Sequence, residues 1–133
     1  MRHEVVDEAY ASTKTMYQAA DMIGQVYGRL KAAARGRLPD DSDLFEPARR
    51  QPMLWEIKWK LGRLGEFRMY HAEPGHDPDL VALRFHRKRT TELSAVEIAE
   101  LQDQEMDLAA ERFVAGEPSR WGHGRSCGDC LHP

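Results

Sequence analysis

The sequence predicts a single α+β domain in which a small twisted antiparallel sheet of three to four strands packs against helices. Three observations predict this class. Residues 53–89 contain three segments in which large apolar side chains alternate with charged ones, the period of a half-buried strand. Segments on either side, residues 12–35 and 94–114, repeat apolar residues at helical spacing. A chain of 133 residues is long enough to bury one core.

The N-terminal third predicts a helix or helical hairpin. Val5 and Val6 carry a weak signal for a short leading strand. Apolar residues then return every three or four positions along residues 12–35, which predicts a helix. Gly24 and Gly28 each disfavour a helix by about 1 kcal/mol relative to alanine, so a break is expected near them.

The three predicted strands occupy residues 53–61, 67–70 and 81–88. Glycines 62 and 65 bracket the first connection, and residues 73–79 form a turn-rich second one. The alternation places Trp55 and Trp59 on the buried side of the first strand. In the third strand it places Val81, Leu83 and Phe85 together on one side.

The last predicted helix begins near Ser94, which forms a capping box with Glu97. Glu105 interrupts the apolar stripe of this helix, and Met106 beside it can cover the gap. The helix is expected to stop at Gly116. We therefore predict one domain over residues 1–116 and a flexible, Gly-rich C-terminal tail over residues 117–133.

The polar sides of the three strands carry cations and proton-transfer groups. If the strands pair in sequence order, they share one exposed surface. Its expected members are Lys58, Lys60, Arg68, Tyr70, Arg84, His86 and Lys88. The formal net charge of −3 argues against indiscriminate nucleic-acid binding, but residues 49–89 are mostly basic and can focus a positive field on one face.

Targeting signals are not evident in the sequence. It has no apolar run long enough to span a bilayer and no signal-peptide core after Met1, so a cytoplasmic protein without membrane contact is expected. Two cysteines close together near the C-terminus cannot form a disulfide framework for the core. With two histidines, they give ligand types that zinc accepts, although an incidental tail or a redox pair explains them as well. These residues are His123, Cys127, Cys130 and His132.

Four segments, in order, resemble the RelE/HigB superfamily of type II toxin–antitoxin toxins, and most closely its phage-derived HigB-like branch. The motifs stand as Leu54-Trp55-Glu56-Ile57-Lys58, Phe67-Arg68-Met69-Tyr70, Phe85-His86-Arg87-Lys88-Arg89-Thr90 and Glu97-Ile98-Ala99. The resemblance covers roughly residues 54–113. It implies a RelE-like fold and an endoribonuclease that needs no cofactor or metal and cleaves ribosome-bound mRNA. It also implies a cognate antitoxin as partner. The chain would form a hetero-oligomer with this antitoxin, or a homodimer.

RNA cleavage without a metal requires a base for the 2′-hydroxyl, cations for the phosphorane and an acid for the leaving oxygen. Arg68 and Arg84 are candidates to clamp the phosphate, because guanidinium groups bind it bidentately. His86 has the pKa best suited to proton transfer near neutrality. Tyr70 or Lys88 could assist if neighbouring cations lowered its pKa. Candidate RNA-binding residues are Lys58, Lys60, Arg63, Arg87 and Arg89.

Two alternatives stay open at this point. Each residue also has an ordinary structural explanation; for example, Arg68 can pair with Glu56 across the sheet. The chain as a whole could instead be a non-catalytic interaction module on the same scaffold, such as a gyrase-directed ParE-like toxin or a phage accessory protein.

Overall fold

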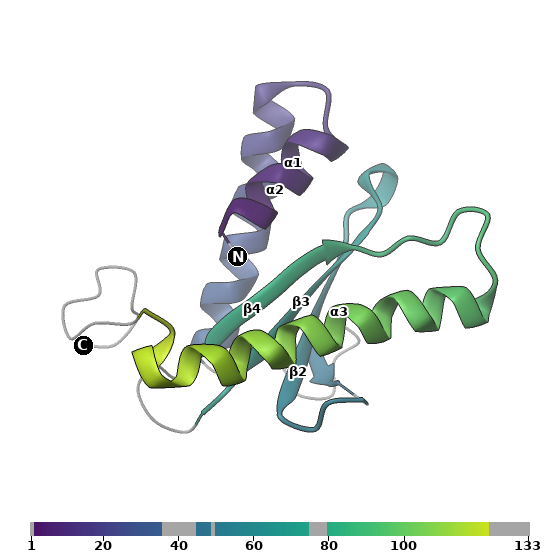
Figure 1. The fold of residues 1–133 in the computed structure, drawn as a ribbon. Coiled ribbons are helices and arrows are strands. Elements are labelled where there is room, and N and C mark those ends of the chain that lie inside the picture. Colours follow the sequence, from purple (N-terminus) through teal and green to yellow (C-terminus); the bar gives the residue numbers. More distant parts are fainter. Residues whose placement is uncertain (1, 36–44, 49, 75–79, 123–133) are drawn as a thin grey trace.

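The computed structural model of the chain describes residues 2–35, 45–48, 50–74 and 80–122. They form three layers (Figure 1). The helices α1 (Arg2–Ser12) and α2 (Met16–Ala34) form a hairpin on one face of a four-stranded sheet, and α3 (Ala95–Gly116) covers the other face. The predicted α+β class with a small antiparallel sheet is therefore confirmed.

The sheet has the order β1-β2-β3-β4, so each strand lies beside its neighbour in sequence. Its strands are β1 (Phe45–Pro47), β2 (Leu54–Lys60), β3 (Glu66–Ala72) and β4 (Val81–Arg87), and all neighbours are antiparallel. A short 3₁₀ helix, η1 (Gly62–Leu64), joins β2 to β3. Among the described residues no strand pairs with the outer side of β4, which is therefore an edge of the sheet.

The N-terminal hairpin differs from the sequence prediction in two ways. Val5 and Val6 lie in α1 and not in a strand, and Val5 is fully buried against the sheet. The chain turns between α1 and α2, before Thr15, whose hydroxyl oxygen accepts a hydrogen bond from the Gln18 N–H at 3.1 Å. α2 then runs through Gly24 and Gly28 without a break. Packing of an apolar face outweighs the weak helix propensity of two glycines.

A register shift in β4 changes which side chains face which layer. Tyr70 pairs with Arg84 and His71 with Ala82, so Leu83 is an additional residue on β4. As a result, Phe85 packs in the core beneath the helical hairpin, while Leu83 packs under α3. The expectation that Val81, Leu83 and Phe85 share one side was therefore wrong, because strict alternation does not continue through a bulge.

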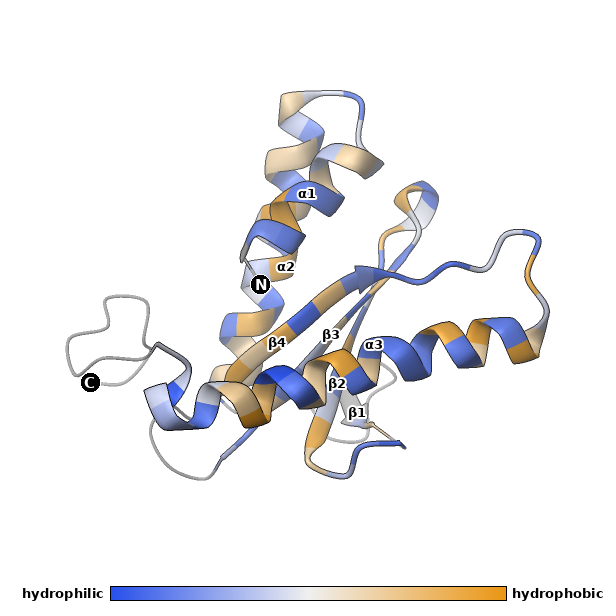
Figure 2. Ribbon diagram, in the orientation of Figure 1, coloured by the Kyte–Doolittle hydropathy of each residue, from blue (hydrophilic) through white to orange (hydrophobic). Residues whose placement is uncertain are grey.

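Two separate cores flank the sheet, and both sheet faces are covered. Figure 2 shows apolar and polar residues interspersed along the strands and α3. Trp59 and Phe85 make an edge-to-face contact in the core under the hairpin, with ring centroids 5.7 Å apart. Trp55 packs against this same core, as predicted. The core under α3 contains Ala48, Leu54, Tyr70, Ala72, Val81, Leu83, Met106 and Ala109.

The last helix confirms its predicted ends. The Ser94 hydroxyl accepts from the Glu97 N–H at 3.1 Å, and the Glu97 carboxylate accepts from the Ser94 N–H at 3.4 Å, which is the predicted capping box. α3 ends at Gly116 and is followed by η2 (Glu117–Gly122). Trp121 in η2 stacks on Phe113 of α3, with ring centroids 5.0 Å apart. The first part of the predicted tail therefore packs on the domain.

Residues 123–133, which include His123, Cys127, Cys130 and His132, lie outside the described part of the chain. Whether they bind zinc stays untested. Within the described residues, no helix has both the length and the apolar character needed to cross a membrane.

Candidate functional site

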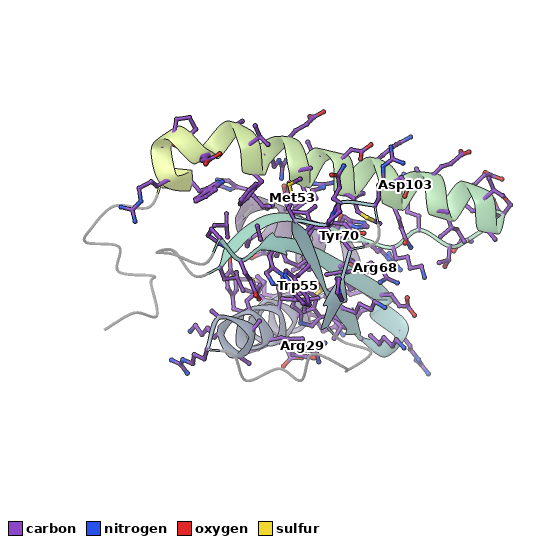
Figure 3. The ribbon with its side chains drawn as sticks, turned by 90° about the horizontal axis from the view of Figure 1, so that it is seen from below. Arg29, Met53, Trp55, Arg68, Tyr70 and Asp103 are labelled. Carbon is purple, nitrogen blue, oxygen red and sulfur yellow. The ribbon has the colours of Figure 1, made fainter. Side chains whose placement is uncertain are left out.

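The predicted catalytic side chains lie on the α3 side of the sheet and are mostly buried. Tyr70 is 0%, His86 6% and Arg68 8% exposed. Figure 3 shows Tyr70 on the side toward α3, whereas Trp55 lies toward α2. The strands do bring these residues together, because Arg68 pairs with His86 in the β3–β4 register. The expectation of an exposed surface was wrong, because α3 packs over this face.

Arg68 is held by a carboxylate in the interior. Its Nη1 atom forms an ion pair with Oε1 of Glu56 on β2, and both side chains are more than nine-tenths buried. Its Nη2 atom also lies 3.8 Å from Oε2 of Glu66. Its Nε–H has no hydrogen-bond partner in the described chain. The cross-sheet pairing with Glu56 is confirmed, and it leaves the buried Nε–H donor of the guanidinium without a partner among the described residues.

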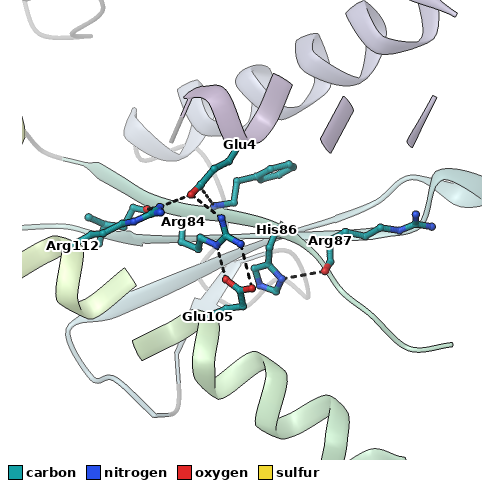
Figure 4. A network of polar contacts seen from close by, with 8 residues as sticks. Glu4, Arg84, His86, Arg87, Glu105 and Arg112 are labelled. Carbon is teal, nitrogen blue, oxygen red and sulfur yellow. Dashed lines mark hydrogen bonds and ion pairs between the residues drawn. The ribbon is translucent and has the colours of Figure 1, made fainter. Parts of the chain in front are cut away.

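Arg84 belongs to a network that joins three elements (Figure 4). Its Nε and Nη2 atoms donate to the Glu105 carboxylate of α3 at 2.5 and 3.3 Å, and its Nη1 atom donates to Glu4 of α1 at 2.7 Å. Hydrogen bonds from Arg84 to Glu105, followed by those to Glu4, raise the pKa of Arg84 despite its partial burial. Because two carboxylates already use its donors, the expectation that Arg84 clamps a phosphate gives way to a structural role.

Glu4 is the centre of the same network. Its carboxylate also accepts from the Phe85 N–H at 3.1 Å and from Nη1 of Arg112 at 2.5 Å. Arg112 in turn donates to the Leu83 carbonyl at 2.7 Å. Burial alone would raise the pKa of Glu4, but these hydrogen bonds together lower it. Side chains from α1 and α3 therefore satisfy backbone groups on the outer edge of β4.

His86 is held as a neutral ring with a defined proton position. It stacks on Tyr70, with centroids 5.5 Å apart and planes at 20°. Its Nδ1 lies 3.2 Å from the Arg87 carbonyl oxygen, and because a carbonyl only accepts, the proton resides on Nδ1. Nε2 then carries a lone pair, and it has no partner among the described residues. Burial, above all, lowers the pKa of His86, so the ring is neutral near pH 7.

Tyr70 behaves differently from the sequence expectation. Burial, and then the charge of Glu56, raise the pKa of its hydroxyl, whereas the sequence analysis required a lowered pKa for proton transfer. The hydroxyl therefore stays protonated, and within the described structure it has no hydrogen-bond partner. Tyr70 can donate a hydrogen bond but is excluded as a base near neutral pH.

The remaining predicted cations line the end of the sheet around η1. Lys60, Arg63, Arg87 and Arg89 are exposed, while Lys58 and Lys88 are half-buried. Nζ of Lys88 lies 3.7 Å from Oε2 of Glu66. The Arg87 guanidinium lies close over Gly65, where an added Cβ would sit 3.0 Å from Nε. We call these six cations the rim: Lys58, Lys60 and Lys88 belong to the predicted surface, whereas Arg63, Arg87 and Arg89 are the other candidate RNA-binding residues.

Three neighbouring side chains thus offer polar atoms that the described chain does not satisfy. We call Arg68, Tyr70 and His86 the polar cluster. It presents one acceptor, Nε2 of His86, and two donors, the Arg68 Nε–H and the Tyr70 hydroxyl. Buried polar atoms without partners are uncommon, since each is unfavourable by about 1–3 kcal/mol, and they often mark functional sites.

Sequence reasoning missed the acidic half of the site. Glu105 gave one visible signal, because it interrupts the apolar stripe of α3. Glu4 gave none, since its partners Arg84 and Arg112 lie 80 and 108 residues away. Among the described residues, no group of three acidic, histidine or cysteine side chains is arranged to hold a metal ion.

Comparison with protein-family models, with curated proteins and with solved structures found no match for this chain.

Proposed function

We propose that the chain is a type II toxin of the RelE/HigB kind: a metal-independent endoribonuclease that cleaves mRNA on the ribosome and is neutralised by a cognate antitoxin. The observation that supports this proposal is the polar cluster. An acceptor and two donors, all buried and lacking partners in the described structure, come from strands whose ends and connections carry the lysines and arginines of the rim. Those are the groups that 2′-hydroxyl attack on a phosphodiester requires.

Each member of the cluster has a role in this proposal. Nε2 of His86 takes the proton from the 2′-hydroxyl, which its neutral ring permits. The Arg68 Nε–H and the Tyr70 hydroxyl donate to the phosphate oxygens as negative charge builds there. Tyr70, still protonated, is also the group available to protonate the leaving 5′-oxygen. The rim of cations holds the flanking phosphates, so binding should weaken as salt rises.

Burial sets a condition on this mechanism. Tyr70 packs in the same core as Met106 and Ala109 of α3, so a nucleotide reaches the cluster only when α3 moves away from the sheet. The proposal therefore includes a displacement of α3 on binding. The N-terminal turns of α3 are the part that can move with the least loss of packing, because Ala95, Val96 and Ala99 are exposed.

A second candidate is the non-catalytic interaction module, such as a gyrase-directed toxin or a phage accessory protein. One observation favours it: both arginines on this face already bind carboxylates, Arg68 with Glu56 and Arg84 with Glu105. A module of this kind needs the rim of cations but no acid–base group.

Induced expression followed by mapping of mRNA 5′ ends separates the two. The wild-type chain should arrest growth and produce new 5′ ends. His86→Gln should reduce cleavage by about 10²- to 10⁴-fold, the usual contribution of general base catalysis. Arg68→Lys, which keeps the charge beside Glu56 but removes the planar Nε–H donor, should also reduce it.

Matched controls come from the helical hairpin. His3→Gln and Arg35→Lys change exposed residues of α1 and of the end of α2, and both should cleave like wild type. The melting temperature of each purified variant shows whether it folds. Growth arrest without new 5′ ends would favour the non-catalytic module, and full cleavage by folded His86→Gln would remove His86 as the base.

A further inference from the structure

Glu105 is a charged residue in a position that the helix pattern reserves for an apolar one. It follows Leu101 by one turn and precedes Met106 and Ala109, which are buried against the sheet. Its side chain is only 25% exposed, and its carboxylate accepts hydrogen bonds from both Nε and Nη2 of Arg84. A carboxylate is kept in such a place only with strong compensating contacts.

The surroundings of His86 show what the carboxylate faces. From β3, Arg68 and Tyr70 lie beside the ring, and Arg84 precedes it by two positions on β4. Arg68 and Arg84 disfavour a proton on the ring. Glu105, from α3, is the acidic side chain that opposes them. Figure 4 shows Glu105 on the same side of β4 as the imidazole.

We propose that Glu105 is a positioning residue for His86: it fixes the Arg84 guanidinium and offsets the positive charge beside the imidazole, so that Nε2 remains basic enough to accept a proton. This inference rests on the proposed function of the polar cluster. It assigns a role to a residue of the C-terminal helix that touches neither the reacting hydroxyl nor the phosphate.

The basicity of His86 matters because a general base works best at a pH near its own pKa. A buried imidazole next to two guanidinium groups would lose basicity from both burial and charge. The Glu105 carboxylate cancels part of this charge effect, and its bidentate contact with Arg84 holds it in place.

Two measurements on three variants test the inference. The first is an NMR titration of the His86 imidazole, and the second is the pH profile of mRNA cleavage by purified protein in the presence of ribosomes. Glu105→Gln keeps the size and a hydrogen-bond acceptor for Arg84 but removes the charge. Glu105→Asp keeps the charge. Glu111→Gln is the control, because Glu111 is an exposed acid on the same helix.

Glu105→Gln should move the His86 titration and the acid limb of the cleavage profile to lower pH, with up to about a tenfold loss of plateau rate. Glu105→Asp should restore much of both, and Glu111→Gln should match wild type. A purely structural Glu105 would lower the melting temperature of Glu105→Gln without moving either profile, and that result would overturn the inference.

The two proposals fail in different ways. An active wild-type chain whose His86 titration does not respond to Glu105→Gln would end the role of Glu105 and leave the nuclease standing. A wild-type chain with no cleavage activity would end the nuclease, and any catalytic role of Glu105 with it, whatever the titration shows.

Discussion

The two faces of the sheet are built from different chemistry. Beneath the α1–α2 hairpin, the interior is apolar and aromatic apart from the buried His71. Trp59 packs edge-on against Phe85, and Phe67 stacks on the same ring with centroids 5.7 Å apart. Beneath α3, apolar residues share the interior with ion pairs and with the polar cluster. Apolar packing on the first face stabilises the fold. On the second face, burial of charged and polar groups offsets part of the free energy gained by apolar packing. Functional chemistry is therefore expected on the second face.

The largest expected effect tests the apolar face. Trp59→Ala should destabilise the protein by about 3–5 kcal/mol, because it removes a large side chain that is 1% exposed and leaves a cavity between α2 and the sheet. Chemical denaturation measures this loss. Leu101→Ala on α3, where the side chain is half-buried, is the matched control and should have a clearly smaller effect.

On the charged face, one substitution should cause a comparable loss of stability, and a second substitution should restore most of it. Arg68→Met should destabilise by about 3–5 kcal/mol, since it leaves the Glu56 carboxylate buried without its cation. Adding Glu56→Leu should recover most of that loss, because replacing a whole buried ion pair by apolar residues is often neutral. Denaturation of both variants decides the matter. If the double variant were no more stable than the single one, the contrast between the faces would be wrong.

A smaller effect should appear as pH dependence through Glu4. Its pKa is lowered in the folded state, so the stability it contributes is present above its unfolded pKa and is lost as pH falls through the folded value. Glu4→Gln should destabilise by about 1.5–3 kcal/mol at pH 7, the range for hydrogen bonds to charged groups. The gap in melting temperature between wild type and Glu4→Gln should narrow below about pH 4. A constant gap down to acid pH would contradict the network.

The smallest effect concerns the end of α3. A Cβ at Gly116 would lie 2.3 Å from Cδ1 of Trp121, so Gly116→Ala should push the indole off Phe113 and break its hydrogen bond to the Phe113 carbonyl. We expect a loss of about 1 kcal/mol and a red shift of tryptophan fluorescence. Gly28→Ala is the control, because nothing lies within 4 Å of that position, and it should be neutral or slightly stabilising.

Local patterns predicted the apolar face well and the charged face poorly. The alternation around Trp55 and Trp59, and the capping box of Ser94 and Glu97, depend on neighbouring residues and were confirmed. A strand face that meets solvent and one that meets a charged helix have the same alternation, so the burial of Tyr70 and His86 was not visible. Nor was the bulge at Leu83, because register depends on both strands.

Glu4 has a consequence for how the chain folds during synthesis. One of its partners, Arg112, follows it in the sequence by 108 residues. Helix α1 can pair with α2 and then with the edge of β4, but the network around Glu4 is complete only when Arg112 of α3 is in place. Closure of the molecule therefore depends on contacts between distant parts of the sequence, which form slowly because a long loop must first be ordered.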